Sequence, residues 1–247
     1  MSDSTQSFEE RLERAKLDAM KELAYGASHE INNPLANISA RAQTLLRDER
    51  DPERRRALEA INHQALRAHE MISDLMLFAR PPRLDLQPVN LAALAKQVVS
   101  EVAADCERRG IELAADVDDA LREINVDPVQ FGVAVKAVVV NSIEAIGQGG
   151  RVQVSITPTA NADPGERGSP AGVRIEVRDN GPGISPEART HLFDPFYSGR
   201  EAGRGLGFGL PKAWRIVTAH GGRIWAETSS DEGATFVIEL PTGAGRS

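Results

Sequence analysis

The 247-residue sequence has one cysteine, few aromatic residues and no excess of positive charge, and each shortage excludes a class of protein. Cys106 has no second cysteine to pair with, so an internal disulfide framework is excluded and a reducing compartment is favoured. Aromatic residues at 4% provide no row of stacking platforms for single-stranded nucleic acid. A net charge of −7 argues against a general binder of nucleic acid or of anionic membranes.

Long apolar runs are also missing. No segment approaches the roughly 20 apolar residues of a membrane span, and the N-terminus lacks the basic-then-apolar pattern of a secretory signal. We therefore expect a cytoplasmic chain without a membrane span, either whole or as the cytoplasmic part of a longer protein. Hydrophobic residues still make up 41% of the sequence, enough to bury a core in one large domain or in two ordinary ones.

The first third of the sequence predicts two long helices. Apolar residues recur at intervals of seven between about Phe8 and Arg47, which indicates one helix. The repeat runs through Leu17, Ala24, Ile31, Ile38 and Leu45, with a companion seam near Met20, Ala27, Leu35 and Ala42. A polar loop at 48–52 leads to a second helix from about Glu53 to Ala79. Such a hairpin cannot cover its own apolar seam, so we expect a homodimeric four-helix bundle.

A proline pair marks the boundary between the two halves. Pro81-Pro82 ends the second helix, because proline lacks a backbone donor and biases the residue before it out of the helical region. Beyond it, helices are predicted near 91–109, 128–146 and 207–220, and strands near 111–115, 123–126, 152–157, 173–178, 223–228 and 234–240. The expected organisation is a helical hairpin over 1–80, a linker over 81–89, an α+β sandwich over 90–242 and a tail over 243–247.

The first helix carries a candidate phosphoacceptor group. At about 100° per residue, His29 and Asn33 lie roughly 40° apart, on the side of the helix opposite Ile31. An exposed imidazole can act as a nucleophile, the carboxylate of Glu30 can accept its proton, and the Asn33 amide can orient a water. A lone exposed histidine is usually only a solvated residue. In a helix interior, however, asparagine is less favourable than alanine by about 0.5 kcal/mol and proline by about 3 kcal/mol. The sequence Asn32-Asn33-Pro34 inside a predicted helix therefore indicates a functional constraint.

The second half offers candidate nucleotide contacts. Asn141 stands in an otherwise apolar helix, where an amide must be hydrogen-bonded internally or must bind something, such as Mg²⁺ through its oxygen. Asp179 follows a predicted strand and precedes Gly181 and Gly183. This arrangement can present a carboxylate to an adenine amino group while glycine lets the backbone approach the base. A plain tight turn is the alternative interpretation.

A second glycine-rich segment precedes the helix predicted at 207–220. It is not a P-loop, because no Gly-Lys-Ser/Thr follows its glycines. Its backbone amides can instead hold phosphates at the positive end of the helix, with Arg200 and Arg204 as cationic partners. The predicted phosphate-binding residues are Arg200, Gly203, Arg204, Gly205, Leu206 and Gly207.

Taken together, these segments resemble the core of the sensor histidine kinases of two-component signalling. His29–Leu35 is similar to the H box of that family, Asn141–Ala145 to the N box, and Asp179–Ile184 to the G1 box. Phe193–Tyr197 resembles the F box and Gly203–Leu210 the G2 box, while the Asn-Asn-Pro sequence resembles the nitrogen-regulator-like subgroup.

The resemblance implies a dimerisation and phosphotransfer hairpin joined to a Bergerat-type ATP-binding sandwich. It implies that His29 is phosphorylated from Mg-ATP, with Glu30 as the base, and then passes the group to an aspartate in the receiver domain of a response regulator. It further implies that Asn33 assists a phosphatase reaction, that Asn141 binds Mg²⁺, that Asp179 recognises adenine, and that an upstream sensor module supplies the signal.

One position departs from the family pattern. Ala137 stands four residues before Asn141, where many members carry a second polar residue and related ATPases carry a catalytic glutamate. Ala137 therefore argues against simple ATP hydrolysis, as in a chaperone-like or repair-type ATPase, and such an enzyme has no use for the His29 helix. A non-catalytic phosphotransfer or scaffold dimer is the other alternative.

Overall fold

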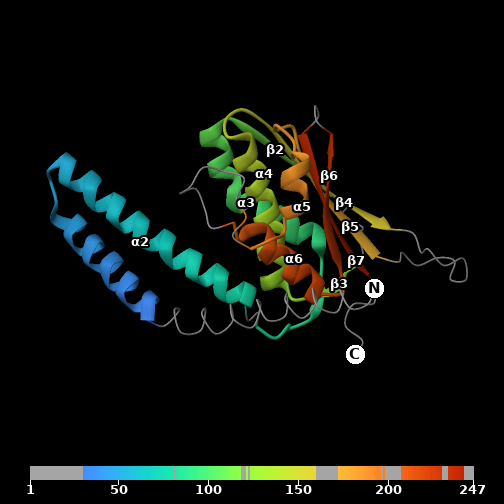
Figure 1. Cartoon of the computed structure of the whole chain (residues 1–247), viewed down its shortest axis with the longest axis horizontal. Coiled ribbons are helices and arrows are strands. Elements are labelled where there is room, and N and C mark those ends of the chain that lie inside the picture. Colours follow the sequence, from blue (N-terminus) through green and yellow to red (C-terminus); the bar gives the residue numbers. More distant parts are fainter. Residues whose placement is uncertain are drawn as a thin grey trace, which may run out of the picture. The chain divides into compact units, whose positions relative to one another are not determined.

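The computed structural model describes residues 30–79, 82–117, 121, 123–159, 172–195, 197, 207–229 and 233–241. The chain divides into two compact units, Met1–Pro82 and Arg83–Ser247. In the first unit, a helix over residues 30–48 and helix α2 (Pro52–Ala79) form the predicted antiparallel hairpin (Figure 1). Asp51 caps α2, because its side chain accepts hydrogen bonds from the backbone N–H groups of Glu53 and Arg54.

The two apolar seams of the first helix have different surroundings. The companion seam faces α2: Ala42 is 3% exposed, and Ala65 and Leu75 are the buried residues opposite it on α2. Ile31, Ile38 and Leu45, by contrast, are 41%, 44% and 60% exposed. The described part of the chain does not cover this stripe, and the homodimer stays a prediction.

The second unit is a two-layer α+β sandwich, as predicted. Its main helices are α3 (Leu91–Arg109), α4 (Pro128–Ile146), α5 (Pro186–His191) and α6 (Gly209–Ala219). Its strands are β1 (Gln87–Val89), β2 (Ile111–Val117), β3 (Ile124–Val126), β4 (Gly150–Thr159), β5 (Gly172–Asp179), β6 (Arg223–Ser229) and β7 (Gly233–Pro241). Five strands form a mixed sheet in the order β2-β4-β5-β7-β6, in which only the β2–β4 pair is parallel.

Helices α3, α4 and α6 cover one face of this sheet (Figure 1). The core between the layers is built from fully buried side chains such as Phe131 and Val138 on α4, Ile175 on β5 and Phe236 on β7. By length and composition α4 alone among the described helices could cross a bilayer, but its buried apolar side chains belong to this core. Its hydropathy is therefore that of a core helix.

Helix caps explain why three helix boundaries are predictable from the sequence. Asn90 caps α3 by accepting from the backbone N–H of Ala93 at 3.0 Å, and Gly110 ends the helix in the left-handed conformation. Asp127 caps α4 and Pro128 occupies its first turn. Two short elements were not predicted: α5, and strand β1, which lies within the segment 81–89 and pairs with β3.

Candidate functional site

Two of the three candidate phosphoacceptor residues, Glu30 and Asn33, lie in the first turn of the described part of the hairpin. His29 is outside the described residues, which begin with Glu30. Glu30 and Asn33 are both exposed, whereas Asn32 and Leu35 are half-buried on the side facing α2. The structure therefore leaves the carboxylate and the amide accessible to solvent, as a reaction with a group held elsewhere requires.

Asp179 is the best defined of the predicted nucleotide contacts. It is the last residue of β5 and is only 2% exposed. Its Oδ1 accepts hydrogen bonds from the backbone N–H groups of Gly181 at 3.0 Å and Ala234 at 3.3 Å. Its Oδ2 is buried and has no hydrogen-bond partner among the described residues. Oδ1 thus forms the tight turn of the alternative interpretation, and the adenine assignment of Oδ2 stays a prediction.

An unpaired buried oxygen has a physical consequence. A buried acceptor left without a donor is unfavourable by about 1–3 kcal/mol, and by more when the group is charged. Native proteins retain such atoms where an ordered water, an ion or a ligand supplies the missing hydrogen bond. An amino group such as that of adenine is a suitable donor, so the residues present fit a purine base at this position.

The turn after Asp179 explains its two glycines. A β-carbon on Gly181 would lie 3.0 Å from Asp179 Oδ1 and 3.5 Å from the side chain of Ile146. Gly183 has φ of +74°, a conformation that other L-residues rarely adopt. The turn is therefore kept free of side chains where Asp179 meets the end of α4.

Sequence reasoning missed Gly233 and Ala234, the first two residues of β7. The N–H of Ala234 holds Asp179 Oδ1, and a β-carbon on Gly233, whose φ is +86°, would overlap the carbonyl oxygen of Asp179. Glycine is thus required for β7 to close against the end of β5. The available signal was a glycine at the start of a predicted strand, which indicates a close backbone approach.

Asn141, the predicted magnesium ligand, lies near the C-terminal end of α4. It is half-buried, as is Ala137 one turn earlier on the same face. Ile146, which packs against the Asp179 turn, is five residues further on, or about 7.5 Å along the helix axis. Next to Asn141, the buried hydroxyl of Ser142 has no hydrogen-bond partner among the described residues. An amide oxygen is a hard ligand of the kind that Mg²⁺ prefers.

The predicted phosphate-binding segment is described only at its end. Arg200, Gly203, Arg204, Gly205 and Leu206 lie outside the described residues. Gly207 has φ of +70° and leads through the buried Phe208 into α6. Phe208, the N-cap of α6, makes no side-chain capping hydrogen bond. The first N–H groups of a helix can bind an anion.

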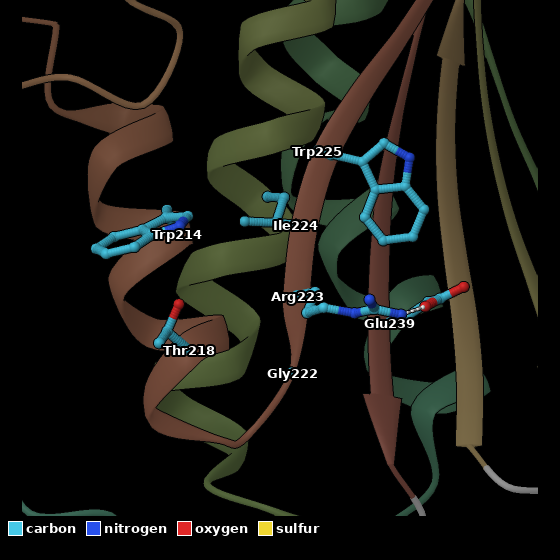
Figure 2. A pocket seen from close by; sticks show the side chains of 7 residues that line it. All are labelled: Trp214, Thr218, Gly222, Arg223, Ile224, Trp225 and Glu239. Carbon is cyan, nitrogen blue, oxygen red and sulfur yellow. Dashed lines mark hydrogen bonds and ion pairs between the residues drawn. The ribbon is translucent and has the colours of Figure 1, made fainter. Parts of the chain in front are cut away.

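A groove of about 530 Å³ lies elsewhere on this unit, over α6 and the edge strand β6. Figure 2 shows Trp214 and Thr218 on α6, with Ile224 of β6 between them and the strand backbone. Trp225, Arg223 and Glu239 lie on the other face of the sheet, where Arg223 pairs with Glu239 at 3.0 Å. None of the predicted site residues lines this groove.

Family models match both units. Residues 19–83 match the His Kinase A (phospho-acceptor) domain, and residues 126–244 match the histidine kinase-, DNA gyrase B- and HSP90-like ATPase family. The first match covers the predicted H box and the second covers Asn141, Asp179 and the glycine-rich segments. The first distinguishes this chain from ATPases that share only the nucleotide fold.

Relatives extend the likeness over nearly the whole chain. The sensor histidine kinase ZraS of Escherichia coli (strain K12) is 32% identical over 247 residues, which are 98% of this chain and 50% of ZraS. The sensory histidine kinase/phosphatase NtrB of Salmonella typhimurium is 32% identical over 244 residues, 98% of this chain and 68% of NtrB. The chain thus spans about half the length of ZraS and two thirds of NtrB.

A solved structure agrees with the fold. The full-length ShkA structure, a complex with AMPPNP, has a TM-score of 0.75 and 26% identity, covering 91% of this chain and 47% of ShkA. One conclusion follows from the hairpin and sandwich architecture, the five motifs, the two family matches and the relationship to NtrB. The chain belongs to the sensor histidine kinases of two-component signalling.

Proposed function

We propose that this chain is an ATP-dependent protein histidine kinase that phosphorylates itself on His29. Residues 1–80 supply the phosphoacceptor, and residues 90–242 bind the nucleotide. The observation that supports the proposal most is Asp179 Oδ2, which is buried at a glycine turn without a hydrogen-bond partner among the described residues. This position suits an adenine amino group. In a scaffold dimer that binds no nucleotide, this buried oxygen would have no hydrogen-bond donor among the described residues.

The reaction at His29 is a phosphoryl transfer. A bond forms between an imidazole nitrogen and the γ-phosphorus of ATP while the bond from that phosphorus to the bridging oxygen breaks, and ADP leaves. The other imidazole nitrogen loses its proton to the neighbouring Glu30, whose exposed carboxylate is free to accept it. Neutral imidazole is the nucleophilic form, so a nearby carboxylate also helps by holding the reactive tautomer.

The nucleotide contacts follow from the site. Asp179 accepts from the adenine amino group, and Gly181 and Gly183 let the turn approach the base. Arg200, Gly203, Arg204, Gly205, Leu206 and Gly207 hold the phosphates at the N-terminus of α6. Asn141 would hold Mg²⁺, which supplies charge neutralisation at the phosphates when it is bound.

The product is a phosphohistidine, and its acceptor is an aspartate in the receiver domain of a separate response regulator. Asn33 lies in the same turn as Glu30, and its exposed amide can orient a water that hydrolyses the phosphoaspartate of that regulator and releases phosphate, which is the opposing, phosphatase reaction. We place the reaction in the cytoplasm, where ATP is available, and assign it to a homodimer joined through the exposed Ile31, Ile38 and Leu45 stripe. An upstream sensor module would set the balance between the two activities.

The test is incubation with γ-labelled ATP and Mg²⁺, followed by measurement of the acid lability and alkali stability of the label. We expect such a label in the wild type and in His63→Ala, an exposed histidine of the same hairpin, but none in His29→Ala. No label with retained ATP binding would favour the scaffold dimer. Loss of binding as well would overturn the nucleotide assignment.

A further inference from the structure

A hydrogen bond ties the phosphoacceptor turn to the second helix of the hairpin. Asn32 Oδ1 lies 3.0 Å from His69 Nδ1, across 37 residues of sequence. With the Asn32 oxygen as acceptor, the His69 ring donates through Nδ1–H. Asn32 is adjacent to Asn33 and two residues after Glu30, so the contact joins α2 to the turn that carries two of the three proposed reactive residues. In the sequence, Asn32 is three residues after His29.

That turn lacks part of its internal support. Pro34 has no backbone N–H, so the carbonyl of Glu30, four residues earlier, receives no helical hydrogen bond from it. A helix missing one bond of its ladder is free to bend or rotate locally. A cross-helix contact at Asn32 therefore constrains the turn at the point where its own backbone constrains it least.

A second polar pair occupies the equivalent position one heptad further along. Ser39 donates to Asn62 Oδ1 at 2.7 Å, and Ser39 and Asn62 are each seven residues from Asn32 and His69 respectively. Ser39 is 7% exposed, so this pair lies inside the hairpin and can fix the register of the two helices. The Asn32–His69 pair is exposed on the His69 side and adds a contact beside the reactive residues.

We propose that His69 is a positioning residue for the chemistry at His29. By holding Asn32, it fixes the rotation of the described turn that carries Glu30 and Asn33, which directly follows His29 in the sequence. This inference rests on the proposed kinase function and adds a residue that none of the five motifs contains. Misplacing catalytic groups by about 1 Å can slow a reaction by as much as 100-fold. ATP binds to the other unit, so loss of the contact is expected to slow phosphorylation without weakening ATP binding.

The experiment measures the initial rate of His29 labelling at varied ATP in the full chain. We expect His69→Ala and Asn32→Ala each to lower kcat by about tenfold with KM unchanged, and the double variant to be no slower than either. His69→Asn should restore the rate, because its amide nitrogen occupies the place of Nδ1, whereas His69→Gln places its amide near Nε2 and should not. Ser39→Ala is the matched control and should lower hairpin stability while leaving kcat unchanged.

The outcomes separate this proposal from the proposed function. A wild-type chain that takes no label would overturn both. A labelled wild type with an unchanged His69→Ala rate, a raised KM, or additive effects in the double variant would overturn the positioning role alone. The tautomer of His69, read from its ring ¹⁵N shifts, should change from Nδ1–H in the wild type to a mixture in Asn32→Ala.

Discussion

The α-carbon of Gly233 lies against the carbonyl oxygen of Asp179, so closely that a β-carbon would overlap that oxygen. The next residue, Ala234, donates its N–H to the same aspartate's Oδ1. The start of β7 therefore sets the position of the carboxylate proposed to recognise adenine. A backbone feature far from the G1 box in sequence thus belongs to the same site.

The Gly233→Ala variant should lose both stability and nucleotide affinity. The left-handed backbone disfavours a non-glycine residue by about 1–2 kcal/mol, and the overlap must additionally push β7 away from Asp179. We expect a lower urea midpoint and ATP affinity reduced by about tenfold, measured by titration with a fluorescent ATP analogue.

Gly110→Ala is the matched control for that variant. Gly110 also has a positive φ, of +66°, but a β-carbon there meets nothing within 4 Å. The Gly110→Ala variant should lose only the stability that the left-handed backbone at this position takes from glycine, and it should bind ATP as the wild type does. Wild-type affinity in Gly233→Ala would show that β7 does not position the carboxylate.

The Asp179→Asn variant should separate ligand binding from folding. The substitution replaces the Oδ2 acceptor by an NH₂ donor, which cannot pair with the adenine amino group. An unmatched buried polar group is unfavourable by about 1–3 kcal/mol, so ATP affinity should fall by roughly 10- to 100-fold. Stability should change little, since Oδ2 has no partner among the described residues. Asp105→Asn, a carboxylate paired with Arg109 on α3, is the control and should bind ATP as the wild type does. Equal affinities in the two variants would contradict the adenine assignment.

His220 illustrates what the sequence did not reveal. It is the C-cap residue of α6 and is only 3% exposed. Its Nε2 accepts from the backbone N–H of Asp127 at 3.0 Å, its Nδ1 donates to the Ile216 carbonyl at 2.8 Å, and its ring meets Phe131 edge-on. The contact joins residues 93 apart in sequence, which no local pattern encodes.

Local signals were sufficient for other elements. The ends of α3 and α4 were predictable because Asn90, Gly110 and Asp127 satisfy helix termini with neighbours only a few residues away. The H box, Asp179 and its glycines were predictable for the same reason, being compact in sequence. Gly233 and His69 were not, because each acts on a site residue through a contact between distant segments.

Acid should remove a contribution of Asp127 to stability. Burial alone would raise the pKa of this carboxyl, but hydrogen bonds from the backbone N–H groups of Gln130, Asp85 and Val129 and from the Gln130 side chain hold it below its usual value. A lowered folded-state pKa means that the contribution is present above the unfolded value of about 3.9 and is lost as pH falls through the folded-state value.

The Asp127→Asn variant tests whether this stabilisation is lost as the pH falls. The variant should be less stable than the wild type at pH 7, and the difference in unfolding free energy should shrink below about pH 4 as the wild-type carboxyl protonates. Asn90→Ala removes the neutral cap of α3 and should lower stability by about 1 kcal/mol at every pH. A difference between wild type and Asp127→Asn that stays constant down to pH 2 would rule out the linkage.

Dimerisation should depend on the exposed stripe of the first helix. Ile38 lies at the centre of that stripe and is 44% exposed in the single chain. Packing it against a second copy would bury an apolar surface, whereas a carboxylate there would have to be desolvated without a partner. We therefore expect Ile38→Glu to raise the dimer dissociation constant at least about 100-fold, equivalent to roughly 3 kcal/mol, as measured by analytical ultracentrifugation. Val129→Glu changes a residue that is 75% exposed in the other unit and should leave the dimer intact. If Ile38→Glu dimerised like the wild type, the stripe would not be the interface, and the second copy would have to join through another surface.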